Sequence, residues 1–201
     1  MTVITLFDGS AMDLADPSNA PVDVNVLALV LSRLARFNGH TRQFYSVAQH
    51  SVFVSHLVPD DHALAGLLHD AAEAYVGDIA SPLKRLLGRT IEDLEDEILF
   101  RVCDVIDPTH DVYHKTNSAT VRRADVIALA TEARDLMNGP LDCPLDPFGP
   151  EITALPPEQA QWMFLNRYRE LRPGADVALP AGINMSALTR EMKRCRDLRY
   201  L

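Results

Sequence analysis

The chain places a histidine, His50, in the middle of an apolar helical stripe. The surrounding stretch "YSVAQHSVFVSHLV", from Tyr45 to Val58, repeats apolar residues at steps of three and four, which is the spacing of one helix face. The residues that share this stripe with His50 are Val47, Val54 and Leu57. A buried histidine usually stays neutral and donates one ring hydrogen to a carbonyl. A metal-binding role requires further residues that would bind the same ion.

A second histidine and several acids could provide those further ligands. His69 and Asp70 are adjacent, and Glu73 follows them at helical spacing, so Glu73 lies beside the patch that they form. The dipeptide alone is common and is usually incidental on a solvent-facing helix. Asp125 is three or four residues from apolar positions of its own segment, so it also projects from an apolar face. Asp78 follows the expected end of the helix that carries the dipeptide.

A shared divalent cation would explain why four such residues lie on apolar faces, since an unpartnered buried carboxylate is costly. The four expected ligands are His50, His69, Asp70 and Asp125. Imidazole with carboxylate oxygen suits zinc, manganese, iron or cobalt better than calcium, which prefers oxygen alone. Each neutral histidine would also need an acceptor for its other ring nitrogen.

The segments that carry these residues all have the periodicity of helices. The spacing predicts helices over residues 22–37, 45–58, 61–76, 91–106, 118–137 and 157–171. The turn signal Asp8-Gly9, between weakly alternating residues, is compatible with a short N-terminal β-hairpin. We therefore expect an all-α domain of at least six helices.

Composition limits the class of protein and its partners. The chain has 201 residues, 47% hydrophobic and 23% charged, which is the balance of a globular domain with its own core. A net charge of -9 argues against duplex nucleic acid as a partner. No apolar run approaches the roughly 20 residues of a membrane span, and no signal peptide is recognisable. The three separated cysteines indicate no disulfide framework, so we expect a cytoplasmic protein without a membrane partner.

Four motifs together resemble the HD-domain metal-dependent phosphohydrolases, whose signature is H…HD…D. The stretches that carry the resemblance are "RF" at Arg36-Phe37, "FYSVAQHS", "LLHDAAEAYVGDIASPLK" and "RRADVIALATEARDLM". They are most similar to the small bacterial and phage branch that includes 5'-deoxynucleotidases and dATP triphosphohydrolases. The resemblance covers residues 1–172, the expected HD-domain bundle. Within it, residues 139–157 are expected to form a proline-rich strap or lid. Residues 173–201, which follow it, form a tail expected to be part helical.

The resemblance implies roles for individual residues. Besides the four metal ligands, Glu73 and Asp78 would be catalytic, and Arg36, Phe37 and Lys84 would bind the substrate. The cofactor would be Zn²⁺, Co²⁺ or Mn²⁺, with Mg²⁺ as an alternative.

The function implied by the resemblance is hydrolysis of a deoxynucleotide. The expected substrate is a dATP-like triphosphate, because Arg36 and Lys84 provide two cations, and a 5'-deoxynucleotidase acting on monophosphates is the alternative. A non-catalytic nucleotide-binding regulatory protein is the alternative of another class. The resemblance also implies a homo-oligomer, a dimer or larger, in the cytoplasm of a bacterium or, for a phage protein, of its host.

Overall fold

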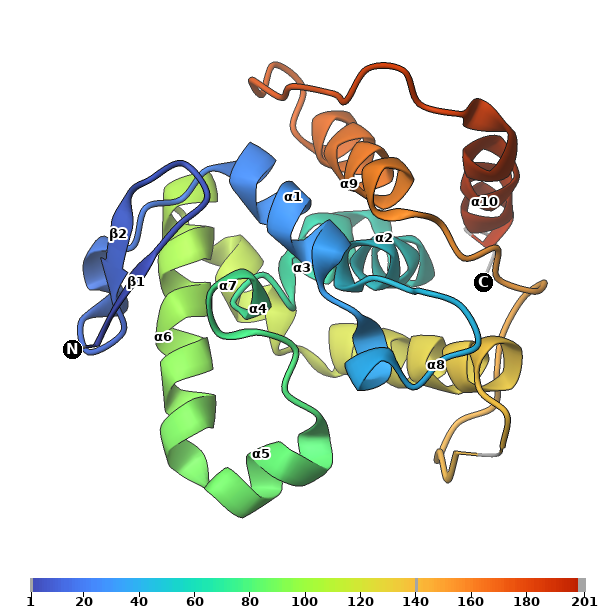
Figure 1. Cartoon of the computed structure of the whole chain (residues 1–201), viewed down its shortest axis with the longest axis horizontal. Coiled ribbons are helices and arrows are strands. Elements are labelled where there is room, and N and C mark those ends of the chain that lie inside the picture. The colour runs from blue at the N-terminus through green and yellow to red at the C-terminus, as the bar shows by residue number, and fades with distance from the viewer. Residues whose placement is uncertain (1, 140, 199–201) are drawn as a thin grey trace.

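The computed structural model describes residues 2–139 and 141–198, and most of them are helical (Figure 1). Pro140 of the expected strap and residues 199–201 of the expected tail lie outside the described residues. The all-α class is confirmed. The N-terminal hairpin is also confirmed, because β1 (Val3–Thr5) pairs antiparallel with β2 (Ala11–Asp13). The helices are α1 (Val24–Arg33), α2 (Val47–Leu57), α3 (Ala63–Leu68), α4 (Glu73–Val76), α5 (Ser81–Leu87), α6 (Arg89–Ile106), α7 (Asp111–Thr116), α8 (Ala119–Leu136), α9 (Pro157–Leu171) and α10 (Met185–Asp197).

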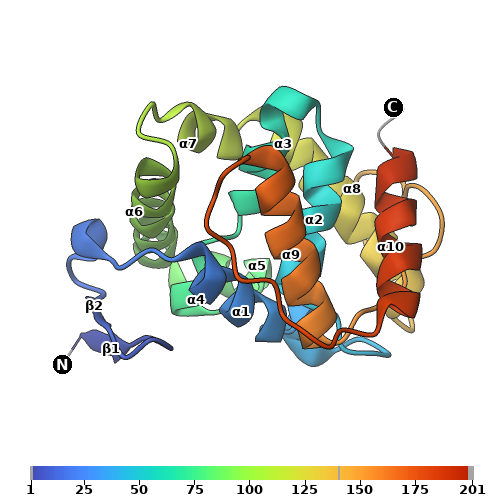
Figure 2. The ribbon, with the colours of Figure 1, turned by 90° about the horizontal axis from the view of Figure 1, so that it is seen from above.

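Helix α2 is the centre of the molecule, and it contacts α1, α3, α8 and α9. Its first turn is capped by Ser46, whose side chain accepts a hydrogen bond from the backbone N–H of Gln49. Its ten residues from Val47 to His56 are all buried, as expected for a helix that is enclosed on every side. Figures 1 and 2 show that the hairpin and α10 lie at opposite ends of the bundle around α2.

The helix predicted over residues 22–37 is shorter in the structure, and this changes the position of Arg36. Helix α1 ends at Arg33, and Leu34 has an extended conformation. Ala35 then forms an isolated antiparallel bridge with Ser46, and the N–H of Arg36 donates to the carbonyl of Tyr45 at 2.9 Å. The prediction was wrong here because pairing with the chain before α2 satisfies backbone groups that another helical turn would have satisfied. Arg36 therefore begins a 3₁₀ turn, Arg36–Gly39, in place of a further turn of α1.

The single helix predicted over residues 61–76 is also wrong. Helix α3 ends at Leu68, and α4 begins at Glu73. Between them the backbone hydrogen bonds span three residues instead of four. The N–H of Ala71 donates to the carbonyl of Leu68, and the N–H of Glu73 donates to the carbonyl of Asp70. His69 and Asp70 therefore lie in a tightened turn rather than within a regular α-helix.

The proline-rich segment after α8 has no helix or strand across its described residues, and side chains of three helices hold it. The N–H of Ile152 donates to Asp135 of α8, that of Leu155 to Gln49 of α2, and that of Thr153 to Glu191 of α10. Helix α10 lies in the expected tail, and its Leu188 and Cys195 are fully buried.

Candidate metal centre

Side chains from α2, α8 and the turn after α3 converge at one point. The Nε2 atom of His50 lies 3.3 Å from Nε2 of His69 and 3.1 Å from Oδ1 of Asp125. One potential ligand atom from each of these three residues lies within 4.8 Å of the other two. Oδ2 of Asp70 lies 3.5 Å from His50 Nε2 and 3.3 Å from His69 Nε2. The structure thus brings together the four predicted ligands, and the group formed by His50, His69 and Asp125 could hold a metal ion.

The other nitrogen of each ring already has a partner. His50 Nδ1 lies 2.6 Å from Oε1 of Glu132, and His69 Nδ1 lies 2.8 Å from the carbonyl of Gly66. Both partners are acceptors, so each Nδ1 carries a hydrogen, and in the neutral rings the two Nε2 lone pairs face each other. Two lone pairs at 3.3 Å repel each other unless a proton or a cation lies between them. This donor set fits a divalent ion.

Glu132 is a site residue that the sequence reasoning missed. Its side chain is fully buried, and its second oxygen, Oε2, lies 3.4 Å from Nη2 of Arg36. Glu132 thus contacts a predicted metal ligand and a predicted substrate-binding residue at the same time. A signal for it exists in the sequence, since Glu132 follows Asp125 by seven residues and therefore lies on the same face of α8 two turns later.

Arg36 is held between two carboxylates. Its Nη1 lies 3.4 Å from Oδ2 of Asp70, its Nη2 contacts Glu132, and its side chain is 11% exposed. Phe37 is half-buried, and the Arg36 guanidinium lies 5.7 Å from the centre of its ring. Phe37 and Asn38 both have positive φ angles, 55° and 51°, which is an uncommon backbone conformation for residues with a side chain. Arg36 is thus charged, largely enclosed and directed at the predicted ligands.

Glu73 and Lys84 line a cavity of about 180 Å³ beside the candidate metal centre. His69, Asp70 and Glu95 belong to the same lining. Glu73 is 5% exposed, and its Oε2 has no hydrogen-bond partner in the described part of the chain. Burial, with the nearby charges of Asp70 and Asp78, raises the pKa of Glu73 to about 10. Glu73 is therefore protonated at neutral pH.

Asp78 and Lys84 lie at the edge of the site. Asp78 is half-buried between α4 and α5, and burial raises the pKa of its carboxyl group above the usual value. Lys84 of α5 is paired with Glu95 of α6, with Nζ 2.8 Å from Oε1. The structure therefore places Lys84 near the candidate site, but with its charge already compensated by a carboxylate.

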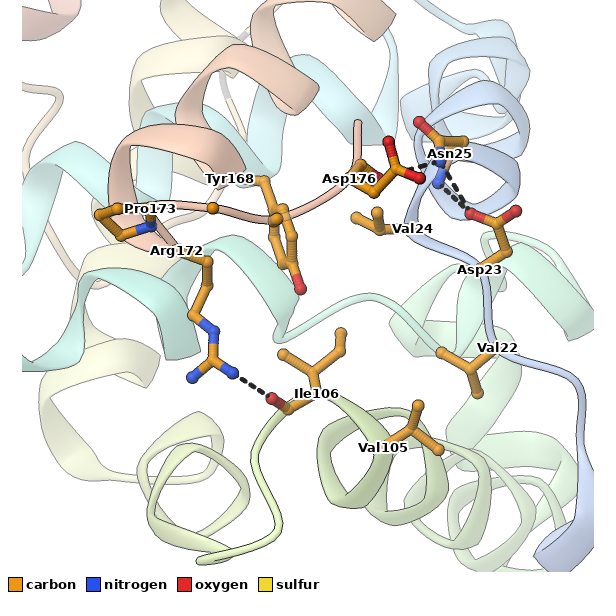
Figure 3. A pocket seen from close by; sticks show the side chains of 12 residues that line it. Val22, Asp23, Val24, Asn25, Val105, Ile106, Tyr168, Arg172, Pro173 and Asp176 are labelled. Atoms are coloured by element: carbon orange, nitrogen blue, oxygen red, sulfur yellow. Dashed lines mark hydrogen bonds between the residues drawn. The ribbon is translucent and has the colours of Figure 1, made fainter. Parts of the chain in front are cut away.

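A larger cavity, about 680 Å³, lies elsewhere, and none of the predicted site residues lines it (Figure 3). Its wall comes from the start of α1 and the ends of α6 and α9, and in Figure 3 Arg172 donates to the carbonyl of Ile106. Cavity size alone would therefore have selected a different part of the molecule from the one indicated by the convergence of ligands.

The fold and this site define a mainly helical protein with a candidate metal centre at the junction of three helices. No protein-family model matches the chain. It is 37% identical to the uncharacterized protein YfdR of Escherichia coli strain K12 over 184 residues, which span 85% of this chain and 96% of that protein. The chain therefore belongs to the same protein family as YfdR.

A second relative is an uncharacterized protein of Rhodobacter capsulatus. It is 34% identical over 102 residues, which span 46% of this chain and 52% of that protein. In addition, no helix within the described residues combines the length and the apolar character needed to cross a bilayer.

Proposed function

We propose that the chain is a divalent-metal-dependent phosphohydrolase of the HD-domain class that acts on nucleotides. The convergence of two imidazole Nε2 atoms with the carboxylates of Asp70 and Asp125 carries this proposal. The mixed nitrogen and oxygen donor set suits Zn²⁺, Co²⁺ or Mn²⁺, with Mg²⁺ as the harder alternative. When bound, such an ion would neutralise charge on a phosphate and lower the pKa of a bound water.

The side chains around the centre would divide the remaining work. Arg36 would bind a phosphate oxygen, and its contacts with Asp70 and Glu132 fix its orientation before the substrate arrives. Glu73 holds a proton at neutral pH and faces the cavity, so it would donate that proton to the leaving oxygen. Asp78 would orient the attacking water. Phe37 would contact the sugar or the base.

The nucleotide could be a triphosphate, as expected above, or a monophosphate, as for a 5'-deoxynucleotidase. The charges of the site favour the monophosphate. A triphosphate needs several cations, but Arg36 already contacts two carboxylates and Lys84 is paired with Glu95. The adjacent cavity, of about 180 Å³, is also lined by Glu73, Glu92 and other acids. This environment suits one phosphate better than three.

Phosphate release from a panel of deoxynucleoside mono- and triphosphates, with Zn²⁺, Co²⁺ or Mn²⁺, would test the proposal. We expect activity with at least one metal and its loss in Asp70→Ala. His50→Ala should abolish metal binding, whereas His56→Ala, on the same helix, should retain it. Metal binding without phosphate release would support the non-catalytic nucleotide-binding protein instead. Release that continues unchanged in Asp70→Ala would contradict the assigned site.

A further inference from the structure

The cavity in Figure 3 has the volume and the lining of a small-molecule binding site. Its volume, about 680 Å³, lies within the range of roughly 300 to 1,000 Å³ that such sites have. One part of its wall is apolar and consists of Val22, Val24, Val105 and Ile106. Val105 is 42% exposed, so this apolar wall is partly open to solvent. The uncharged part of a ligand would cover it.

Arg172 and Tyr168 provide hydrogen-bond donors at one side of the cavity (Figure 3). Nη2 of Arg172 donates to the carbonyl of Ile106 at 2.8 Å, but the guanidinium forms no ion pair within the described residues. Tyr168 is 6% exposed, and its hydroxyl points into the cavity, where no described residue accepts its hydrogen. Burial raises the pKa of Tyr168, although the charge of Arg172 opposes this, so the hydroxyl keeps its proton at neutral pH. A buried phenol usually has a partner, and an anionic group of a ligand would supply one here.

Two carboxylates, those of Asp23 and Asp176, lie at the other side of the cavity (Figure 3). Asp23 accepts hydrogen bonds from the backbone N–H of Asn25 at 2.8 Å and from its side-chain amide at 3.0 Å. The same amide donates to the backbone carbonyl of Asp176 at 3.4 Å, so Asn25 holds the two acids near each other. Neither carboxylate forms an ion pair in the part of the chain that the structure describes, with Arg172 or with any other cation.

The cavity thus has uncompensated charges of opposite sign at its two sides and an apolar wall between them. A ligand with a negative charge alone would be repelled by the two carboxylates, and one with a positive charge alone would be repelled by Arg172. A ligand that carries both charges, at opposite ends of an apolar body, is complementary to both sides.

We propose that this cavity binds a small zwitterion. Its anionic group, a carboxylate or a phosphate, would contact Arg172 and Tyr168, and its amino group would contact Asp23 and Asp176. The proposal does not depend on the proposed function, because none of the residues of the candidate metal centre lines this cavity.

The first test is an NMR titration that follows the backbone N–H groups of Gly174 and Ala175, which line the cavity. The probe is p-aminomethylbenzoate, which has a carboxylate and an amine at opposite ends of a benzene ring. We expect saturable shifts of these N–H signals, and binding at least about 10-fold weaker for p-methylbenzoate and p-methylbenzylamine, which each lack one charge. Replacing the carboxylate of the probe by a phosphonate would show which anion is preferred. No saturable shift with either anion, or equal affinities for the singly charged probes, would overturn the proposal.

A second test changes the donors at the anionic end. Arg172→Gln removes the charge but keeps a donor for the carbonyl of Ile106, and it should bind p-aminomethylbenzoate at least about 10-fold more weakly. Tyr168→Phe removes only the hydroxyl and should weaken binding roughly 3- to 10-fold. Arg169→Gln is the matched control, because Arg169 is an exposed cation of α9 that does not line the cavity. Unchanged binding by Arg172→Gln would contradict the proposal.

The acids at the other end can be tested without loss of the helix cap. Asn caps a helix as well as Asp does, so Asp23→Asn should keep the start of α1 intact. Combined with Asp176→Asn, it should weaken the binding of p-aminomethylbenzoate and leave that of p-methylbenzoate no weaker than in the wild type. An equal loss for both compounds would show that the acids do not recognise the amino group, and would also contradict the proposal.

Discussion

At the scale of single residues, Glu132 connects His50, an expected metal ligand, to Arg36, the cation expected to bind phosphate. One of its oxygens orients the His50 ring and the other contacts Arg36. Carboxylates that orient ligand histidines fix the ring tautomer and raise the basicity of the ligand. In the proposed function, Glu132 would therefore be a positioning residue that acts through its two neighbours.

We expect Glu132→Gln to weaken metal binding about 10- to 100-fold, because the neutral amide leaves the imidazole less basic. Calorimetric titration with Zn²⁺ or Mn²⁺ would measure the change. Glu158→Gln, at an exposed position in the first turn of α9, provides the control and should bind as the wild type does. Equal affinities for the two variants would show that Glu132 has only a packing role.

Glu73 is expected to lower the stability of the fold. Its pKa, raised from 4.5 to about 10, means that the folded state retains a proton that the unfolded state releases above pH 4.5. Stability therefore falls as pH rises through this window. Glu73→Gln removes this titration. At pH 8 its free energy of unfolding should therefore exceed that of the wild type by on the order of 1 kcal/mol or more, and its melting temperature should be higher.

Melting curves of both proteins at pH 4 and pH 8 would check this expectation. The difference should be small at pH 4, where both states of the wild type are protonated, and large at pH 8. A margin that does not change with pH would mean that the effect of Glu73 is steric and not electrostatic.

At the scale of elements, Gly66 sets the distance between α2 and α3. A Cβ atom at this position would lie 3.1 Å from Cα of Ser55 and 3.3 Å from its backbone nitrogen, and a backbone cannot move as a flexible side chain can. The carbonyl of Gly66 also accepts the hydrogen bond that orients His69. The same residue thus controls the packing of two helices and the orientation of His69, an expected metal ligand.

Gly66→Ala should therefore be destabilising despite the better helix propensity of alanine. The propensity gain is about 1 kcal/mol, whereas overpacking costs roughly 1 to 3 kcal/mol. We also expect weaker metal binding, since α3 must move away from α2 and carry His69 with it. Denaturant unfolding and metal titration would show both effects, and Gly139→Ala, where a Cβ meets nothing within 4 Å, should show neither.

The elements that could be predicted from sequence are those whose periodicity is uninterrupted. The helix predicted over 157–171 matches α9, and that over 118–137 differs from α8 by one residue at each end. The end of α1 could not be predicted, because Arg36 pairs there with Tyr45, nine residues later in the chain. The end of α3 could not be predicted, because the helix tightens locally to i→i−3 hydrogen bonds, which apolar periodicity does not reveal. Glu132 was missed because a single acid on a helix does not by itself indicate burial, and its one signal, the seven-residue spacing from Asp125, depends on Asp125 first being taken as a ligand.

At the scale of the whole molecule, the four expected ligands come from three separate parts of the bundle: α2, the turn after α3, and α8. A bound ion would connect α2, α3 and α8, and any ligand that binds only the folded state stabilises it. At 100 times the dissociation constant the stabilisation is about 2.7 kcal/mol. The melting temperature should therefore rise with added Zn²⁺ or Mn²⁺ and fall again with a chelator.

The control for this measurement is the variant Asp125→Ala. The side chain of Asp125 is 42% exposed, so its removal should disturb the core little. Its melting temperature should not respond to either metal. An equal rise in this variant would indicate that the ion binds at a different place in the molecule.

The contact between His50 and Glu132 joins residues 82 positions apart in the chain. Contacts of such long range form late in folding, because the intervening segment must be ordered first. An ion at this site would therefore leave the refolding rate nearly unchanged and would mainly slow unfolding. The candidate metal centre would thus set the lifetime of the folded chain, and depletion of the metal would shorten that lifetime before it altered the rate at which the protein is formed.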